Sequence, residues 1–303
     1  MENQNRQEAR FNRLPMGINF VLNVVVIIFV ALCIVPLLLT VIVSFSDETE
    51  ILRLGYSFTP AKLSLEAYRY VFAGDVIWRS YGITTFVTIL GTLASLIVIT
   101  LFAYPISRRD FKQRNMLSFV VFFTMIFSGG LVPWYMVYVH LIPIKNTVWV
   151  YIVPSLMNCW YVLIMRTFFR TTVPDELLEA SRLDGAGEFR TFFSVVLPIS
   201  KPGLATVGLF CMLQYWNDWY LPLVFIDKTE LYNVQYVLAK MLSNLTWLSQ
   251  NSQYITGSTS FSNTPSETSR MAIAVLSIGP IIFAYPFFQR YFIKGLTIGA
   301  VKG

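Results

Sequence analysis

The sequence predicts an all-α integral membrane protein with six transmembrane helices and with both termini in the cytoplasm. Of its 303 residues, 55% are hydrophobic and only 13% are charged, whereas a soluble domain carries about 25% charged residues. Six long apolar stretches separate the charges, and each can hold the roughly 20 residues that cross a bilayer. With the N-terminus inside, fifteen of the 23 Lys and Arg residues face the cytoplasm, which satisfies the positive-inside rule.

Each apolar stretch is expected to form one spanning helix. The first is longer than the roughly 7–15 apolar residues of a cleavable signal peptide, so we expect it to remain as an anchor. The six-helix domain covers residues 16–292, with cytoplasmic tails at 1–15 and 293–303. We expect the spans at residues 18–45, 81–104, 117–139, 147–164, 203–226 and 271–288.

The third stretch contains residues that disfavour a continuous helix. Gly129 and Gly130 lie in its middle and Pro133 follows, and both residue types weaken a helix. Irregular backbone at membrane depth usually lines a cavity. We therefore expect a helix break near the two glycines. The chain has no Gly-Lys pair and so no phosphate-binding P-loop, and we expect no cofactor on this chain.

Polar and aromatic side chains gather in the fourth and fifth stretches. An acid within a span is rare and marks a candidate functional site, and Asp218 is such an acid. Aromatic rings beside amide and carboxylate groups also suit sugars, which offer apolar faces and many hydroxyls. Two interpretations remain open, namely contact with a transported substrate, or helix-end packing and pore gating. The candidate residues are Asn158, Tyr161, Tyr215, Trp216, Asn217, Asp218 and Trp219.

The most polar segment within the six-helix domain covers residues 172–200. Pro174 suits the first position of a helix, and Asp175 and Glu176 follow in the first turn, where the positive helix end favours carboxylates. Gly185 indicates a helix stop, since glycine readily takes the left-handed conformation needed there. A second helical pattern follows. We expect two short amphipathic cytoplasmic helices joined by a bend.

This segment resembles the EAA loop of ABC importer permeases. Ser181 stands where the loop usually has a second alanine, which is a small-for-small change. The resemblance implies the type I ABC importer permease fold, in which the loop is a coupling helix that inserts into a groove of the ATP-hydrolysing subunit. Taken alone, the segment also fits a surface helix pair between two spans. The matching residues are Glu179, Ala180, Ser181, Asp184, Gly185, Ala186, Leu197 and Pro198.

The C-terminal run and one long loop are two further segments for which the family resemblance implies a role. The C-terminal run resembles the end of oligosaccharide-importer permeases, which implies contact with the ATPase dimer through Lys294, Gly295, Thr297 and Gly299. The extracytoplasmic loop at 227–269 is long, and long connections are usually functional or disordered. It contains one helical pattern near residues 234–248. In maltose-type importers such a loop reaches into the sugar-binding protein.

The resemblance implies a permease subunit of an ATP-driven importer for a sugar, with an oligosaccharide favoured. It implies transport by alternating access in the bacterial cytoplasmic membrane. The implied partners are a second permease chain, two ATP-binding subunits that hold ATP and Mg, an extracytoplasmic sugar-binding protein and the surrounding lipid. ATP hydrolysis by separate subunits means that the chain itself is expected not to be an enzyme.

Other classes of function fit the residues less well. A gradient-driven secondary transporter of small polar solutes would have similar hydropathy, but the chain has no internal repeat and no ionisable relay beyond Asp218. A membrane-embedded enzyme or a metal site lacks a suitable cluster, because His140 is the single histidine. The three cysteines lie inside predicted spans and predict no disulfide framework. The net charge of +6 reflects topology, so we expect no nucleic-acid partner.

Overall fold

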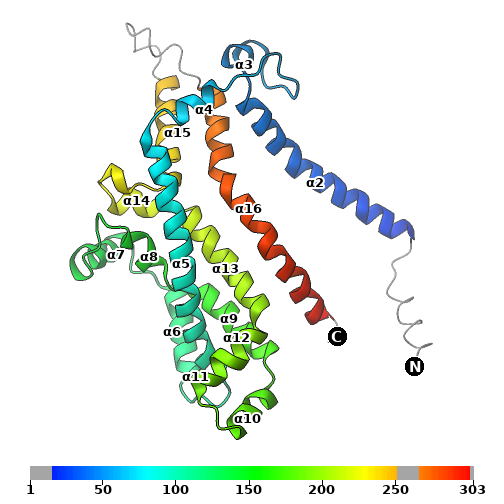
Figure 1. The fold of residues 1–303 in the computed structure, drawn as a ribbon, viewed down its shortest axis with the longest axis vertical. Coiled ribbons are helices and arrows are strands. Elements are labelled where there is room, and N and C mark those ends of the chain that lie inside the picture. The colour runs from blue at the N-terminus through cyan, green and yellow to red at the C-terminus, as the bar shows by residue number, and fades with distance from the viewer. Residues whose placement is uncertain (1–15, 251–265, 301–303) are drawn as a thin grey trace. The chain divides into compact units, whose positions relative to one another are not determined.

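The computed structural model describes residues 16–250 and 266–300, and every regular element in these ranges is a helix (Figure 1). This confirms the predicted all-α class. The described residues form two compact units, one of residues 16–71 with 266–275 and one of residues 72–250 with 276–300. The predicted cytoplasmic tail at 1–15 lies outside the described residues, as do residues 301–303 of the predicted C-terminal tail.

The first unit begins with the first predicted span. This span is α2 (Met16–Ser44), and α3 (Glu48–Leu54) and α4 (Glu66–Val71) follow it. The hydroxyl groups of Ser44 and Tyr68 lie 2.8 Å apart and join the end of α2 to α4. The apolar helix α2 therefore ends at a polar contact with α4.

A carboxylate of the first unit caps the start of α16 (Glu267–Ala300). Glu48 accepts hydrogen bonds from the backbone N–H groups of Ser266, Glu267 and Thr268 at 3.0, 2.9 and 2.8 Å. The first N–H groups of a helix lack intrahelical partners and favour a negative charge. Burial raises the pKa of Glu48, but the hydrogen bonds from Thr268 and these N–H groups outweigh it and lower the pKa. The helix of the sixth predicted span therefore starts at Glu267, before the expected residue 271.

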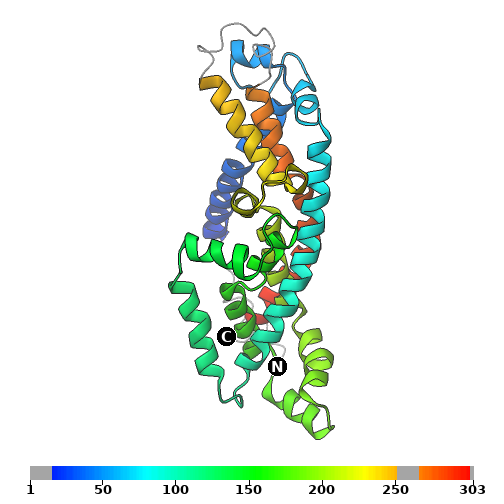
Figure 2. The ribbon, with the colours of Figure 1, turned by 90° about the vertical axis from the view of Figure 1, so that its left-hand side faces the viewer.

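The second unit is built around α5 (Asp75–Ser107), which contains the second predicted span. α5 packs against α13 (Lys201–Trp216) and α9 (Cys159–Thr172), and both views show these helices side by side (Figures 1 and 2). We expected the span to end before Pro105, but the helix continues to Ser107. The fixed φ of proline is itself helical, so one proline near a helix end does not have to stop it.

Two glycines allow the helices of this unit to approach closely. A Cβ atom added at Gly91 of α5 would lie 2.7 Å from the ring of Tyr215, and one added at Gly203 of α13 would lie 2.6 Å from the ring of Phe168. Small residues are used in this way where membrane helices pack. The same unit contains an apolar core of fully or almost fully buried side chains, which includes Ile99, Ala103, Val162, Met165, Phe192 and Val207.

The third predicted span is broken at the position that its glycines indicated. α6 (Arg114–Ile126) ends before residues 127–130, and the chain resumes as α7 (Leu131–Met136) and η1 (Val137–Leu141) at an angle of 113°. Gly130 has φ +85°, a backbone conformation that favours glycine. The predicted helix break near Gly129 and Gly130 is therefore confirmed.

The fourth predicted span is also broken, and here the prediction of a continuous helix was wrong. α8 (Trp149–Ile152) and η2 (Val153–Ser155) meet α9 at an angle of 53°. Asn158 starts the second piece, because its side-chain oxygen accepts the backbone N–H of Trp160 at 2.9 Å. Asparagine is a favoured N-cap residue for this reason. α9 then runs to Thr172, well past the expected end at residue 164.

The fifth predicted span is likewise discontinuous, contrary to the prediction. Residues 217–219 separate α13 from α14 (Tyr220–Phe225). One carboxylate oxygen of Asp218 accepts the backbone N–H groups of Tyr220 and Leu221 at 3.0 and 3.1 Å. Side-chain bonds of this kind compete with helix continuation and begin a new helix. Asp218, a candidate functional residue, therefore also starts the helix α14.

Three helices in the described ranges are long and apolar enough to cross a membrane singly, and the number rises to six if each strongly bent helix pair counts as one span. The third of these pairs joins Glu188–Ile199 to α13 at an angle of 82°. The expected helix of the long loop is α15 (Val234–Gln250), which follows η4 (Thr229–Leu231). The remainder of that loop at 251–265 lies outside the residues that the structure describes.

Candidate functional site

The coupling segment forms the expected pair of short helices. The first is α10 (Asp175–Leu183). The second is a helical run made of α11 (Glu188–Thr191), η3 (Phe192–Val196) and α12 (Leu197–Ile199). Pro174 occupies the N-cap instead of the first helical position that we predicted. The two acids still lie in the first turn of α10, where the helix dipole favours them.

The bend between the helices has a defined hydrogen-bond pattern. Gly185 has φ +74°, and its N–H donates to the carbonyl of Arg182 at 3.0 Å. The N–H of Ala186 donates to the carbonyl of Ser181 at 3.0 Å. These two bonds are those of a Schellman motif, which ends a helix through a left-handed residue. The predicted stop at Asp184 and Gly185 is therefore present in the backbone.

Two hydroxyl groups hold the coupling helices together. The side-chain oxygens of Ser181 on α10 and Thr191 on α11 lie 2.7 Å apart, and both residues are buried. The serine that replaces the usual alanine therefore adds a contact between the two helices. Leu197 is half-buried and packs against the apolar core, whereas Pro198 is exposed.

Two large apolar side chains of the pair are exposed. Leu183 is 89% exposed and Phe189 is 77% exposed, one on each side of the bend. Glu179 and Ala180 are also exposed. Phe189 lines a cavity together with Leu101 and Tyr104 of α5. Leu183 is therefore the apolar side chain of the bend that a partner can cover.

A cavity of about 560 Å³ lies where the broken helices meet. All three breaks contribute to it, because its lining includes the glycine loop before α7, the end of η2 and the turn before α14. Irregular backbone at membrane depth is expected to line such a space. The lining residues are Ser128, Gly129, Gly130, Leu131, Trp134, Pro154, Ser155, Gln214, Asp218, Tyr220 and Leu221.

Asp218 and Gln214 give this cavity its hydrogen-bonding capacity. Asp218 lines the cavity, and its second carboxylate oxygen is buried without a hydrogen-bond partner in the structure. Gln214 lies four residues earlier, about one helical turn away, and its side-chain oxygen accepts from the amide of Asn158 at 3.5 Å. Trp134 and Tyr220 supply aromatic faces in the lining. The cavity therefore combines amide, carboxylate and aromatic groups.

The other predicted path residues do not line this cavity. The hydroxyl of Tyr215 lies 2.8 Å from that of Ser95, and the indole N–H of Trp216 donates to the carbonyl of Ser277 at 3.0 Å. Both aromatic residues are buried between helices. Tyr161 stacks on Phe210 with ring centroids 5.9 Å apart, and Asn217 and Trp219 are exposed.

Several residues of the lining were not among the candidate residues from the sequence. They are Ser128, Trp134, Ser155, Gln214 and Tyr220. Gln214 is the one with a usable signal, since it is an amide inside an apolar stretch, one turn before Asp218. The predicted ATPase contacts Lys294, Gly295, Thr297 and Gly299 fall on α16, but their side chains lie outside what the structure describes.

No group of three or more His, Cys, Asp or Glu residues that could hold a metal ion occurs in the part of the chain that was described. Cys33, Cys159 and Cys211 are free thiols.

Comparison with known proteins identifies relatives along almost the whole chain. A family model described as "Binding-protein-dependent transport system inner membrane component" matches residues 10–298. The polygalacturonan/rhamnogalacturonan transport system permease protein YtcP of Bacillus subtilis is 34% identical over 277 residues, which cover 91% of this chain and 95% of that protein. The arabinooligosaccharides transport system permease protein AraQ of Halalkalibacterium halodurans is 30% identical over 273 residues, with coverages of 88% and 91%.

A solved structure is also similar. It is a bacterial ABC transporter involved in the import of the acidic polysaccharide alginate, and one of its chains aligns with a TM-score of 0.78 at 28% sequence identity. The alignment covers 92% of this chain and 99% of that chain.

Proposed function

The chain belongs to the binding-protein-dependent transport system inner membrane component family, and from this premise we propose that it imports a sugar with energy from ATP that partner subunits hydrolyse. It has the predicted type I ABC importer permease fold, and it is an inner-membrane component as expected. The observation that carries the proposal is the bent pair of α10 and the α11–α12 run. Its exposed Leu183 at the bend is suited to a groove of an ATPase subunit.

An oligosaccharide is the proposed substrate class. The names of two relatives refer to polygalacturonan and rhamnogalacturonan or to arabinooligosaccharides, and the similar structure belongs to a transporter involved in alginate import. The cavity at the helix breaks supports this class, because it offers an amide, a carboxylate and two aromatic rings. We propose that sugar passes this cavity, with Asp218 and Gln214 as its hydrogen-bonding groups.

The coupling segment also bears on the proposed assembly. Each chain carries one such segment, so two permease chains engage two ATP-binding subunits. We propose a different permease chain as the partner. ATP and Mg belong to the ATP-binding subunits in this proposal, and the tail with Lys294 and Gly295 contacts them. An extracytoplasmic binding protein delivers the sugar to the loop at 227–269.

Alternating access is the proposed mechanism. Closure of the ATPase dimer moves α10 and α11, and the movement passes to the helices that line the cavity. A conformational change of this kind needs two states that a ligand favours differently, and rigid-body motion of helices around a fixed site provides them. The segment is continuous with α9 on one side and with α13 on the other.

Uptake experiments in cells test this function against the gradient-driven alternative. Uptake of labelled oligosaccharides is measured in cells with and without the gene. Each measurement is made after ATP depletion and, separately, after a protonophore has collapsed the proton gradient. We expect gene-dependent uptake that stops on ATP depletion and continues when only the gradient is lost. Uptake that stops with the gradient while ATP remains high contradicts the proposal and indicates a secondary transporter.

Replacing Gln214 tests the cavity as the sugar path. Gln214→Leu keeps the side-chain volume and removes the amide. One lost hydrogen bond contributes about 1 kcal/mol, so the sugar concentration for half-maximal transport should rise roughly fivefold. The matched control is Asn217→Ala, because Asn217 is exposed and three residues away. Equal transport kinetics for the Gln214 variant and the unaltered protein would show that sugar does not use this cavity.

A further inference from the structure

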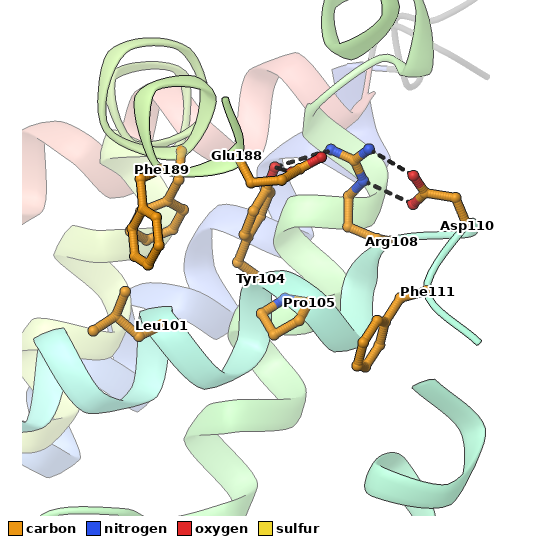
Figure 3. Close-up of a pocket in the computed structure, with 9 residues that line it drawn as sticks. Leu101, Tyr104, Pro105, Arg108, Asp110, Phe111, Glu188 and Phe189 are labelled. Atoms are coloured by element: carbon orange, nitrogen blue, oxygen red, sulfur yellow. Dashed lines mark hydrogen bonds and ion pairs between the residues drawn. The ribbon is translucent and has the colours of Figure 1, made fainter. Parts of the chain in front are cut away.

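Four charged side chains and a tyrosine form a connected cluster at the C-terminal end of α5. Figure 3 shows four of these five residues, namely Tyr104, Arg108, Asp110 and Glu188. Tyr104 and Arg108 come from α5 and the residue at its C-cap, and Asp110 comes from the turn that leads to α6. Arg182 comes from α10 and Glu188 from α11. The cluster thus joins both coupling helices to a helix that is not their neighbour in the chain.

Arg108 is the buried member of this cluster. Its side chain is 10% exposed. It holds the Asp110 carboxylate with two hydrogen bonds, from Nε at 3.1 Å and from Nη2 at 3.0 Å. Its Nη1 donates to the Tyr104 hydroxyl at 2.9 Å and lies 3.6 Å from a carboxylate oxygen of Glu188. Paired hydrogen bonds of this type favour a fixed geometry.

Arg182 completes the link to the coupling helices. Its Nη2 donates both to Asp110 and to Glu188, and the distance to Glu188 is 2.9 Å. Glu188 also accepts the hydroxyl proton of Tyr104 at 3.0 Å. Asp110 therefore accepts hydrogen bonds from two arginines that lie 74 positions apart in the chain. The two positive and two negative charges alternate in space.

The contacts within the cluster keep all four groups charged at neutral pH. The hydrogen bond from Arg108 lowers the pKa of Asp110, burial opposes this, and Arg182 lowers that pKa further. Burial raises the pKa of Glu188, but the hydrogen bonds from Arg182 and Tyr104 outweigh it and lower the pKa. A charged Arg108 without its partners would be costly, because a buried ion that loses its counter-ion is left uncompensated.

The coupling helices are connected to the rest of the second unit in two ways. α9 and α13 are joined to the coupling helices through the chain itself, whereas α5 is joined to them through side chains. Besides the cluster, the rings of Tyr104 and Phe192 lie 5.0 Å apart. α5 is the helix around which the second unit packs. A movement of α10 that reaches α5 therefore reaches the core of the unit.

We propose that the cluster of Arg108, Asp110, Arg182 and Glu188 transmits movement of the coupling helices to α5 during transport. This inference rests on the proposed function of the chain as an ATP-driven permease. In this role the four residues position α5 relative to the coupling helices and touch neither sugar nor ATP. Asp110 is the central residue, because it lies outside both coupling helices and still binds an arginine on each side of the link.

The chain contains a matched ion pair that the proposal does not include. Arg109 and Asp175 lie 3.5 Å apart and connect the same turn to α10, but their side chains are 70% and 55% exposed. Exposed ion pairs contribute little because water and salt screen them. Arg109→Gln therefore removes a charge beside Asp110 without breaking the proposed link.

The test measures sugar transported per ATP hydrolysed by the complete importer in proteoliposomes, together with complex assembly and melting temperature. For Asp110→Asn and for Arg182→Gln we expect assembled complexes with near-normal ATP hydrolysis and a ratio that falls about fivefold or more, as the loss of a typical coupling interaction predicts. Arg182→Gln leaves the pair of Arg108 and Asp110 intact, so this variant still tests the proposal if Asp110→Asn does not fold. Asp110→Glu should restore part of the ratio, and Arg109→Gln should keep the normal value.

Two results would overturn the inference. One is an unchanged sugar-to-ATP ratio in both Asp110→Asn and Arg182→Gln. The other is a parallel loss of transport, ATP hydrolysis and assembly, because that pattern belongs to residues that only stabilise the fold. If the unaltered complex shows no ATP-driven sugar transport, the proposed function itself has failed, and this outcome is separate from any effect of the variants.

Discussion

Gly185→Val is expected to reduce ATP-driven transport about five- to thirtyfold while the protein still inserts into the membrane. Gly185 has φ +74°, and this conformation costs a residue with a Cβ atom about 1–2 kcal/mol. A difference of about 1.4 kcal/mol is tenfold in an equilibrium. No atom lies within 4 Å of an added Cβ, so the effect arises from the backbone alone. The strained bend opens, and Leu183 and Phe189 lose their relative placement.

Two control variants separate backbone shape from side-chain size at this bend. Gly185→Asn should keep most of the activity, because asparagine tolerates a positive φ, as Asn146 does in this chain with φ 59°. Gly187→Ala should also be mild, because Gly187 has φ −69° and open space around it. Transport and co-purification of the ATPase subunit are measured for each. If Gly185→Val behaves like Gly187→Ala, the bend is not needed for coupling.

Gly91→Ala is expected to lower the stability of the folded protein markedly, and Gly91→Val to prevent its accumulation. The added Cβ would lie 2.7 Å from the ring of Tyr215, and no real Cβ contact is that short. The ring has little freedom to move, because it is 2% exposed and its hydroxyl lies 2.8 Å from that of Ser95. Overpacking of this kind costs about 1–3 kcal/mol. Melting of the purified protein in detergent measures the loss.

A second glycine of the same helix provides the comparison. Gly82 lies in α5 with no atom within 4 Å of an added Cβ. Gly82→Ala should be neutral or stabilising by up to about 1 kcal/mol, because alanine is the better helix former. The double variant Gly91→Ala with Tyr215→Leu should recover part of the loss. Equal melting temperatures for the two alanine variants would show that the contact between α5 and α13 tolerates the extra atom.

Much of the fold could be predicted from the sequence because its signals are local. The apolar stretches are long enough to stand out, and α2 and α5 follow them closely. The break near Gly130 and the bend at Gly185 were predictable as well, since both residues have a positive φ that glycine allows. The positions of the α10 helix and of α15 follow from the same local rules.

The cavity could not be derived in this way. It depends on two further breaks, where Asn158 and Asp218 bind backbone N–H groups inside apolar stretches. A polar residue in such a stretch has the same letter whether it caps a helix, lines a cavity or packs. Tyr215 and Trp216 illustrate this, because they were candidates for the sugar path and lie buried against Ser95 and Ser277. Their partners are far away in the chain, so one sequence does not reveal them.

The charge cluster was hidden for a related reason. Arg108 is one of several basic residues at a membrane edge, where such residues usually orient a span. Arg182 belongs to a helix that the sequence did predict, but its partner Asp110 lies 72 residues earlier. The pairing follows from the packing of α10 beside the end of α5, which is a property of the tertiary structure.

ATP hydrolysis in reconstituted membranes is the most direct test of whether the chain is a subunit of an ATP-driven sugar importer. The chain is co-expressed with the neighbouring permease and ATP-binding subunits, and vanadate-sensitive hydrolysis is measured with a binding protein that is empty or loaded with one oligosaccharide from a panel. We expect that one loaded binding protein stimulates hydrolysis and that the empty protein does so much less. If no ATP-binding subunit co-purifies with the chain, or if no loaded binding protein alters hydrolysis, the chain is not an ATP-coupled sugar permease.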